Sequence, residues 1–597
     1  MTPKRTGKGA LILEKGIAFR VWAPHADQVF VSGTFNGWSK TAHPLAGEGN
    51  GYWSTEVSHA KKADQYKYIL IHDGEEWIRI DPYVREVTSS IGNGIIHDPD
   101  FDWGVDEFRV PPLHEMVLYE MHIGTFNDQP GGPPGSFQSA IEKLPYLSDL
   151  GVNVIEIMPA MEFAGGFSWG YNPAHLFAIE SDYGGPKAFK EFVRAAHERG
   201  LAVILDVVYN HFGPSDLDIW QFDGWSAEGK GGIYFYNDWR SETPWGETRP
   251  DYGREEVREY IRDNVLMWLN DYRVDGLRWD MTAYIRNVYG NDNDPEHDIP
   301  EGWGLMQGIN DVIRDPQGRK MTIAEDLKDN PFLTKDTADG GAGFDAQWDA
   351  GFVHPVREAL IASDDQARNV EAVRDAILHR YNESAFERVI YTESHDEVAN
   401  GKARVPEEIS PGDAGSWFAK KRSTLGAAIV FTAPGVPMIF QGQEFLEDEW
   451  FHDEDPIDWS KKEIYKGILD LYRDLIRLRL NSAGLTRGLC GQHVDVHHVN
   501  REDRIIAFHR WDKTGPGDSV IVVLNMVNRS HHQYQIGFPN RGVWKIRFNS
   551  DLIGYDPDFS NHPSSDTVAK ESEKDRMSFA GDISIGPYSA VIFSQDP

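Results

Sequence analysis

The chain of 597 residues contains a single cysteine, Cys490, and no long apolar run. One cysteine cannot form an internal disulfide, so the fold does not depend on an oxidising compartment. The most apolar stretch, residues 425–440, is broken by two prolines and a glycine, which predicts a helix end leading into a buried strand instead of a membrane span. Residues 1–12 lack the apolar segment of a signal peptide. These absences predict a cytoplasmic protein with no membrane partner.

Positive charge is also scarce. The chain has 59 Lys and Arg against 94 Asp and Glu, a formal net charge of −35. This excess of negative charge repels nucleic acid and anionic membranes and suits a neutral ligand. Aromatic residues are abundant, with 19 Trp, 23 Tyr and 30 Phe. Their faces can stack on sugar rings, although most of them are expected to fill the core.

The sequence divides into three parts. Residues 1–105 contain short alternating runs separated by glycine, asparagine and proline, which predicts a small N-terminal β-sandwich. Residues 106–482 alternate strand-like and amphipathic helical segments. That alternation predicts an α/β fold, a (β/α)8 TIM barrel with an outer ring of helices. Residues 483–597 return to short strands and predict a C-terminal β-sandwich.

Eight candidate strands support the barrel: 117–124, 153–158, 202–208, 274–280, 321–325, 344–348, 389–392 and 437–440. Candidate helices among and after them include 185–199, 255–271, 416–431 and 463–480. In a barrel of this kind every strand delivers its C-terminal residue to one shared face. Residues that are far apart in the sequence are therefore expected to meet there.

Carboxylates stand at the ends of three of these strands. Asp280 ends the fourth strand, Glu325 the fifth, and Asp396 follows the seventh. A retaining glycosidase needs a nucleophilic carboxylate and an acid/base carboxyl about 5–5.5 Å apart. Any one of these acids alone is better explained as a surface or helix-capping residue. The three together predict a glycosidase-type site.

The neighbours of these acids suggest how they are tuned. Arg278 lies two residues before Asp280 on the same strand face, where its charge is expected to keep Asp280 ionised. Glu325 follows apolar residues, so burial is expected to raise its pKa and hold its proton.

Three further polar residues follow the second and third strands. Asp206 and His211 close the third strand. Asp206 is explained as an internal hydrogen-bond partner, and His211 is either a core histidine or a site residue. Tyr171 follows the second strand, where it either stacks on the reacting sugar or packs within its loop.

No metal-binding motif is present. The sequence contains no HExxH, no paired cysteines and no EF-hand loop, and His211 and His395 lack local partners at ligand spacing. We therefore expect neither a metal nor a cofactor.

The motifs 206–211, 276–280, Glu325 and 395–396, in this order, resemble the four signature regions of the α-amylase family, glycoside hydrolase family 13. The resemblance implies an α-glucan partner such as glycogen, amylose or a maltooligosaccharide. It assigns Asp280 as nucleophile, Glu325 as general acid/base and Asp396 as the carboxylate that fixes the distorted donor sugar. The residues that it places around the donor subsite are Tyr171, Asp206, His211, Arg278 and His395.

Residues 33–38, Gly-Thr-Phe-Asn-Gly-Trp, resemble a family 48 carbohydrate-binding module. On sequence alone this segment is equally well explained as a hairpin turn with a core tryptophan.

Members of this family hydrolyse or transfer glucans with one set of catalytic residues. Residues 394–398 and 168–171 resemble those of glycogen branching enzymes, whereas residues 182–186 and 207–214 are similar to those of maltooligosyltrehalose trehalohydrolases. We rank branching enzyme first, trehalohydrolase second and an α-amylase-type hydrolase third. A non-catalytic glucan-binding protein would be expected to lack a carboxylate, and none is missing.

An insertion at residues 220–245, rich in aromatics, belongs to neither pattern. It is expected either to bind the acceptor or to pack on itself.

Overall fold

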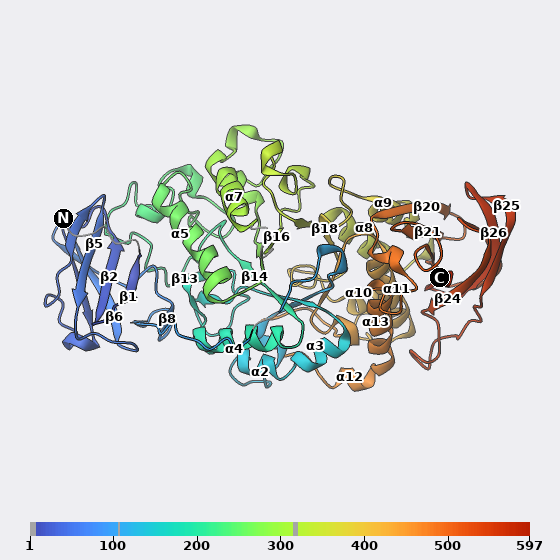
Figure 1. Cartoon of the computed structure of the whole chain (residues 1–597), viewed down its shortest axis with the longest axis horizontal. Helices are drawn as coiled ribbons and strands as arrows, with labels where there is room; N and C mark the ends of the chain where they lie inside the picture. Colours follow the sequence, from blue (N-terminus) through green and yellow to red (C-terminus); the bar gives the residue numbers. More distant parts are fainter. Residues whose placement is uncertain (1–6, 106–107, 315–319) are drawn as a thin grey trace.

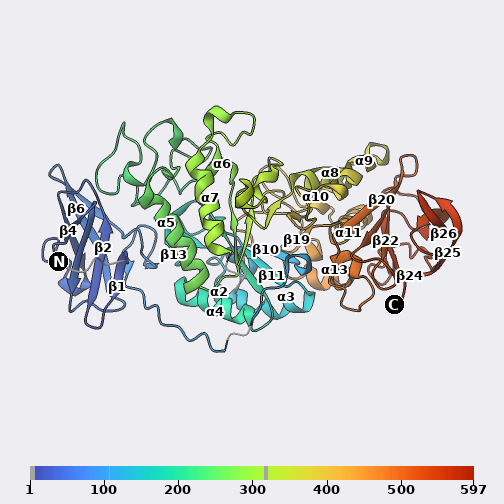
Figure 2. The same ribbon diagram turned by 45° about the horizontal axis from the view of Figure 1, so that its top comes forward.

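The computed structural model describes residues 7–105, 108–314 and 320–597. Its three parts follow one another along the long axis of the molecule, with the N-terminal sheets at one end, a barrel in the middle and the C-terminal sheet at the other end (Figures 1 and 2). This arrangement confirms the predicted fold class. The predicted boundary between residues 105 and 106 lies at the edge of a segment outside the described residues. The boundary after residue 482 stays a prediction; it falls between the last barrel helix and the C-terminal strands.

The N-terminal part consists of two antiparallel sheets. The first has the order β1 (Gly9–Ile12), β2 (Ile17–Trp22), β5 (Tyr52–Val57), β4 (Ala46–Gly49). The second has the order β3 (Gln28–Gly33), β6 (Gln65–His72), β9 (Gly94–Ile95), β8 (Glu86–Val87), and β7 (Glu75–Arg79) pairs with β6. Phe19 and Tyr68 from the two sheets are fully buried in a shared apolar core.

The central part is a closed barrel of eight parallel strands. The strands, in order, are β10 (Leu118–Met121), β11 (Val154–Ile157), β14 (Ala202–Val207), β15 (Gly276–Trp279), β16 (Met321–Ala324), β17 (Ala346–Trp348), β18 (Arg388–Ile390) and β19 (Val436–Phe440). Every one of these strands is buried along its length. Burial on both faces explains why each strand appears in the sequence as a short apolar run.

Helices surround and connect the barrel strands. The longer ones are α3 (Leu144–Leu150), α4 (Gly185–His197), α5 (Glu255–Leu266), α7 (Pro300–Ile313), α8 (Ala350–Ile361), α9 (Val370–Leu378), α11 (Trp417–Thr432) and α13 (Lys466–Arg479). Short helices lie in the loops: α1 (Ile123–Phe126), α2 (Phe137–Ile141), α6 (Ala283–Arg286), α10 (Val405–Ile409) and α12 (Lys461–Ile464). A two-stranded sheet of β12 (Met161–Phe163) and β13 (Pro173–Ile179) follows β11.

Three predicted segments differ from the structure. The strand predicted at 117–124 ends at Met121, because His122 donates its amide N–H to Gln441 Oε1 (2.8 Å) and α1 begins at Ile123. The helix predicted at 255–271 changes to a π-helical turn after Leu266. The helix predicted at 463–480 is two helices, α12 and α13.

The C-terminal part is an eight-stranded antiparallel sheet. Its order is β20 (His493–Asn500), β21 (Ile505–Trp511), β22 (Val520–Asn525), β27 (Ser589–Ser594), β24 (Gly542–Asn549), β25 (Thr567–Lys574), β26 (Met577–Ile585), β23 (His531–Phe538). Neighbouring residues of β21 face two different cores. Phe508 belongs to the apolar cluster of the barrel, and Ala507 to a second cluster inside the sheet. The sheet thus packs on the barrel with one face and on itself with the other.

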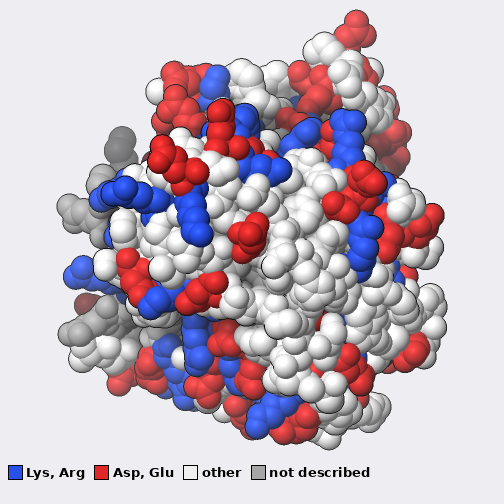
Figure 3. Space-filling view, turned by 90° about the vertical axis from the view of Figure 1, so that its right-hand side faces the viewer, with Lys and Arg blue, Asp and Glu red and all other residues white. Residues whose placement is uncertain are grey.

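Two surface properties bear on the predicted partners. Figure 3 shows acidic and basic side chains interspersed on the end of the molecule formed by the C-terminal part. Within the described ranges, no helix combines the length and apolarity required to cross a membrane.

Candidate functional site

Three of the predicted acids converge on one buried cation. Arg278, on β15, is 0% exposed. Its Nη1 lies 2.6 Å from Asp206 Oδ2 and 3.3 Å from Asp280 Oδ1, and its Nη2 lies 2.8 Å from Glu325 Oε2. Residues from three neighbouring strands therefore share one guanidinium, as expected for strand ends on one face of a barrel.

The packing beneath this cluster holds the cation in place. The guanidinium of Arg278 lies 4.2 Å from the ring centroid of Trp348, which is buried on β17. A cation against the face of an indole is attracted by the ring electrons. Trp348 thus packs against the cation that the three carboxylates share.

Burial dominates the acid–base behaviour of the carboxyl groups. Burial and the neighbouring charge of Glu325 raise the pKa of Asp280, and they outweigh the opposing effect of Arg278. Burial also raises the pKa of Glu325, again against Arg278. The increase for Glu325 agrees with the sequence expectation. Arg278 lowers the pKa of Asp280, as the sequence predicts, but it does not keep this pKa low. One cation is divided among several acids and does not offset their burial.

A second group of polar residues lies around His395. Its ring stacks on Tyr171 with centroids 5.0 Å apart, and its Nε2 lies 3.5 Å from Asp396 Oδ2. The Tyr171 hydroxyl donates to Asp206 Oδ2 at 2.5 Å. Tyr171, His395 and Asp396 therefore join the Arg278 cluster through Asp206.

His211 closes the other side of Tyr171. Burial lowers the pKa of His211 to about 4, so the ring is neutral and its Nε2–H donates to the backbone oxygen of Tyr171 at 2.9 Å. The same ring stacks on Trp245 with centroids 4.6 Å apart. All eight site residues predicted from the sequence thus belong to one connected group.

Sequence reasoning missed two glutamates below this group. Glu120, on β10, accepts from the backbone N–H of His395 at 3.2 Å and lies 2.5 Å from its Nδ1. Glu156, at the equivalent position of β11, is buried, and burial raises its pKa well above the usual range. The available signal was an acid inside an otherwise apolar strand, since such an acid has to face the barrel interior.

The activity is predicted to depend on the protonation of His395, and Glu120 stabilises the protonated form. Burial opposes the imidazolium, as does Arg278, but Asp396 and Glu120 outweigh them and raise the pKa of His395 to about 9. We expect kcat/KM to fall at alkaline pH as His395 loses its proton. In Glu120→Gln one stabilising anion is lost, so the alkaline limb should move to lower pH by about one unit. Coincident pH profiles for the two proteins between pH 6 and 10 would contradict this role.

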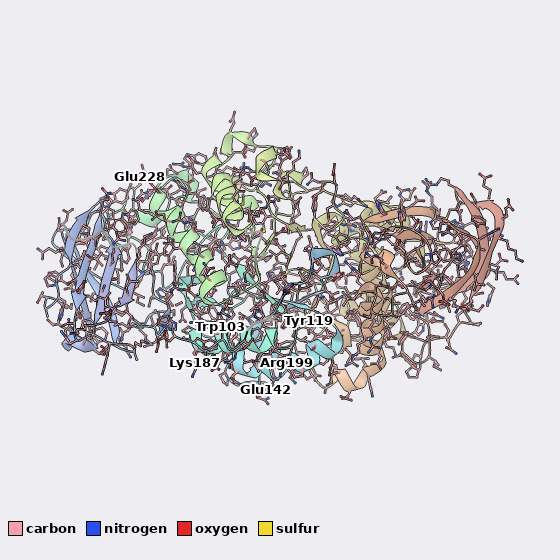
Figure 4. All side chains as sticks on the ribbon, in the orientation of Figure 1. Trp103, Tyr119, Glu142, Lys187, Arg199 and Glu228 are labelled. Atoms are coloured by element: carbon pink, nitrogen blue, oxygen red, sulfur yellow. The ribbon has the colours of Figure 1, made fainter. Side chains whose placement is uncertain are left out.

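The insertion at residues 220–245 has two halves. The first half docks on the N-terminal part, where the Arg79 guanidinium donates to the backbone oxygens of residues 220–222 and Asp223 accepts from the His25 N–H at 2.9 Å. Glu228, within this half, lies at the outer edge of the molecule beside the N-terminal part (Figure 4). In the second half Trp239 and Trp245 are 48% and 37% exposed. The first half therefore packs against the N-terminal part, and the second half carries the exposed tryptophans. Acceptor binding by the insertion stays a prediction.

The described residues offer one group with the geometry to hold a metal ion: Asp27, His72 and Asp73 in the N-terminal part. None of these residues belongs to the carboxylate group around Arg278.

The absence of a metal and of a cofactor from the reaction stays a prediction. We expect dialysis against EDTA to leave activity unchanged, measured as reducing ends released from amylose. A loss on chelation that Ca²⁺ restores would reveal a structural ion.

Comparisons with known proteins cover the same three parts. Residues 8–84 match carbohydrate-binding module 48 (isoamylase N-terminal domain), residues 120–220 and 218–477 match the alpha amylase catalytic domain, and residues 496–596 match the alpha amylase C-terminal all-beta domain.

Curated relatives and solved structures extend along almost the whole chain. The 1,4-alpha-glucan branching enzyme GlgB of Oceanobacillus iheyensis is 29% identical over 573 residues, covering 91% of this chain and 87% of the relative. That of Corynebacterium jeikeium is 29% identical over 582 residues, covering 92% and 78%.

Two solved structures share the fold. A putative alpha amylase from Salmonella typhimurium superposes with a TM-score of 0.74 at 23% identity, covering 99% of this chain and all of that one. A pullulanase complexed with maltotetraose from Anoxybacillus sp. LM18-11 superposes with a TM-score of 0.75 at 21% identity, covering 99% and 88%. The catalytic-domain match, with the flanking domains and the order of the strand-end motifs, shows that this chain belongs to the α-amylase family.

Proposed function

We propose that this protein is a 1,4-α-glucan branching enzyme, which cleaves an α-1,4 linkage and transfers the released chain to form an α-1,6 branch. Asp280 acts as nucleophile, Glu325 as general acid/base, and Asp396 holds the distorted donor sugar. The observation that carries the catalytic roles is the convergence of Asp280 and Glu325 on Arg278. The exposed tryptophans of the insertion and the branching-enzyme relatives support transfer. A double displacement at this site returns an α-configured product.

The contacts of Glu325 suit an acid/base. Its Oε2 lies against Arg278 and accepts from the Met281 N–H at 3.0 Å. Its Oε1 is buried without a hydrogen-bond partner among the described residues. Burial raises the pKa of this carboxyl, which favours its protonated form, and Oε1 is the oxygen free to pass a proton to the leaving sugar.

The contacts of Asp280 suit a nucleophile. Its distance to Arg278 Nη1, 3.3 Å, is longer than the 2.6 Å of Asp206 to the same atom. Asp206 therefore takes most of the interaction with the cation, and Asp280 remains available to attack the sugar carbon. Once Glu325 has given up its proton to the leaving oxygen, the glycosyl bond on Asp280 removes one of the two crowded negative charges.

Tyr171 and His395 complete the donor subsite. Their rings are stacked. The Tyr171 hydroxyl donates to Asp206, and the His395 ring lies beside Asp396. An aromatic ring can cover the apolar face of a sugar, and a protonated histidine can donate to its hydroxyls. Both residues would hold the donor sugar in the orientation that the attack requires.

Transfer needs an acceptor chain bound beside the intermediate long enough to exclude water. Trp239 and Trp245 supply exposed aromatic surface for such a chain. The curated relatives named above are branching enzymes, which supports transfer over hydrolysis. The alternatives are a maltooligosyltrehalose trehalohydrolase and an α-amylase-type hydrolase, and analysis of the reaction products distinguishes them.

One incubation series separates these activities. The protein is given amylose, and separately a trehalose-capped maltooligosaccharide, and the α-1,6 linkages, reducing ends and free trehalose are followed over time. A branching enzyme forms α-1,6 linkages with little net increase in reducing ends. Reducing ends without new branches would establish a hydrolase, and free trehalose a trehalohydrolase. Initially β-configured reducing ends would contradict the double displacement itself.

The acceptor role of the insertion gives a separate prediction. Trp245→Ala and Trp239→Ala each remove exposed aromatic area, so acceptor chains should compete less well with water. We expect the ratio of branching to hydrolysis to fall about two- to tenfold, in line with the value of one aromatic contact. Val543→Ala, an exposed apolar truncation on the C-terminal sheet, is the control. An unchanged ratio in both tryptophan variants would exclude the insertion from acceptor binding.

A further inference from the structure

A groove of about 660 Å³ runs beside Asp396. It begins where the Asn400 side-chain amide donates to Asp396 Oδ1 at 3.3 Å, and it ends at Trp450, which is 56% exposed. The lining residues come from the β12–β13 loop, from the segment between β18 and α11 that includes α10, and from the segment after β19: Trp169, Asn400, Gly401, Lys402, Ala403, Glu407, Glu408, Pro411 and Trp450.

The two tryptophans of the groove are held in position. Trp169 stacks on Phe451 with centroids 5.3 Å apart and meets His395 edge-on. The backbone on both sides of Trp450 is tied to the opposite loop, because the Phe451 N–H donates to the Val398 oxygen at 2.7 Å and the Arg404 N–H to the Glu449 oxygen at 2.7 Å. An exposed indole on such a fixed backbone loses little freedom on binding a ligand.

The groove suits a neutral chain of sugars. It combines two indole faces with an amide, an ammonium group and two carboxylates. The charged groups already have partners within the protein, since Lys402 Nζ lies 2.9 Å from Glu397 Oε2 and the carboxylates of Glu407 and Glu408 accept backbone N–H groups. Charged groups that already have partners supply donors and acceptors for hydroxyl groups beside the aromatic faces without favouring an ionic ligand.

Contacts across the site show which part of a substrate would enter the groove. Trp169 touches His395, His395 stacks on Tyr171, Tyr171 is bonded to His211, and His211 stacks on Trp245. These contacts order the site from the groove at one end to the insertion at the other. Glu325 belongs to the insertion end, because it accepts from Met281, whose oxygen accepts from Tyr284, and Tyr284 packs edge-on against Trp245.

The acid/base protonates the oxygen of the leaving chain, so the leaving chain departs towards the insertion and the acceptor arrives from there. The sugar bonded to Asp280 and the residues on its non-reducing side must then extend the other way, towards Asn400 and Trp450. We propose that this groove binds the donor segment of an α-1,4-glucan, and that Trp450 sets the minimum length of the chain that is transferred. The proposal rests on the proposed function, because a transferred chain exists only if the protein is a transferase.

Binding can be measured without turnover in a Glu325→Gln background. Maltoheptaose titrated into this protein should quench tryptophan fluorescence. Adding Trp450→Ala should raise Kd about tenfold, the value of one good aromatic contact, whereas Trp450→Phe should raise it far less. Ile553→Ala, a truncation of comparable exposure on the C-terminal part, is the matched control. An unchanged Kd in Trp450→Ala would overturn the proposal.

The active protein tests the length. After branching of amylose, the branches are released with a debranching enzyme and their lengths compared. Trp450→Ala should transfer shorter chains than the wild-type protein, because a long donor no longer gains affinity at the far end of the groove. Identical length distributions would remove Trp450 from length selection. If the wild-type protein forms no branches while Trp450→Ala still weakens maltoheptaose binding, the branching function fails and the groove remains a glucan site.

Discussion

Asp280→Asn and Glu325→Gln should each remove most of the activity without unfolding the protein. Both changes replace a carboxylate by an amide of nearly the same shape. Asp280→Asn removes the nucleophile and should lower kcat by about 10³-fold or more. Glu325→Gln removes the acid/base and should lower kcat by about 10²–10⁴-fold.

An activated substrate separates the two roles. An α-glucosyl or maltosyl fluoride has a leaving group that departs without protonation. Glu325→Gln should therefore still form the glycosyl-enzyme from the fluoride, seen as a burst of released fluoride, whereas Asp280→Asn should not. A burst in Asp280→Asn, or near-normal turnover of amylose in either variant, would remove that residue from its proposed role.

Stability provides the control on folding. Burial raises the pKa of both carboxyls in the folded state. Such groups contribute stability below their unfolded pKa, near 4, and that contribution is lost as the pH rises through the folded pKa. An amide does not titrate, so the variants lack this loss. Their Tm should equal or exceed that of the wild-type protein at pH 8. Between pH 8 and pH 5 the Tm of the variants should rise less than the Tm of the wild-type protein. A lower Tm at pH 8 would mean that the carboxylates are structural.

The barrel was predictable because its strands are buried on both faces. A strand such as β14, with the sequence Ala-Val-Ile-Leu-Asp-Val, is an apolar run with one acid near its end, and this pattern needs no tertiary information. The error at β10 shows the limit, since Ile123 and Phe126 continue the apolar run and the strand ends only because Gln441 takes the next amide. That partner is more than 300 positions away, which no local pattern reveals.

The site was predictable in its members but less so in its electrostatics. Strand-end positions identified the acids, yet the pKa of Asp280 depends on how many carboxylates share Arg278 and on the depth of burial. Glu120 escaped notice because its partner, His395, comes from the other end of the barrel sequence. The insertion was ambiguous for a related reason: its first half is held by Arg79 of another domain.

Arg278→Ala should cause the largest loss of stability that the site can produce. The guanidinium is fully buried and faces Asp206, Asp280 and Glu325. Removing it leaves three buried carboxyls without a cation, and breaking a buried pair in this way costs about 3–5 kcal/mol. The free energy of unfolding from denaturant titration, with far-UV circular dichroism as a check on folding, measures the loss.

A second substitution distinguishes electrostatics from lost packing. Asp206→Asn added to Arg278→Ala removes the carboxylate that lies closest to the missing cation, so the double variant should recover part of the lost stability while remaining inactive. Arg388→Ala is the comparison, because Arg388 is equally buried on β18 but has one carboxylate partner, Asp349, and otherwise bonds backbone oxygens. If Asp206→Asn restores nothing, the cost of Arg278→Ala is the cavity beside Trp348 and not the uncompensated charge, since a cavity is indifferent to the protonation of its neighbours.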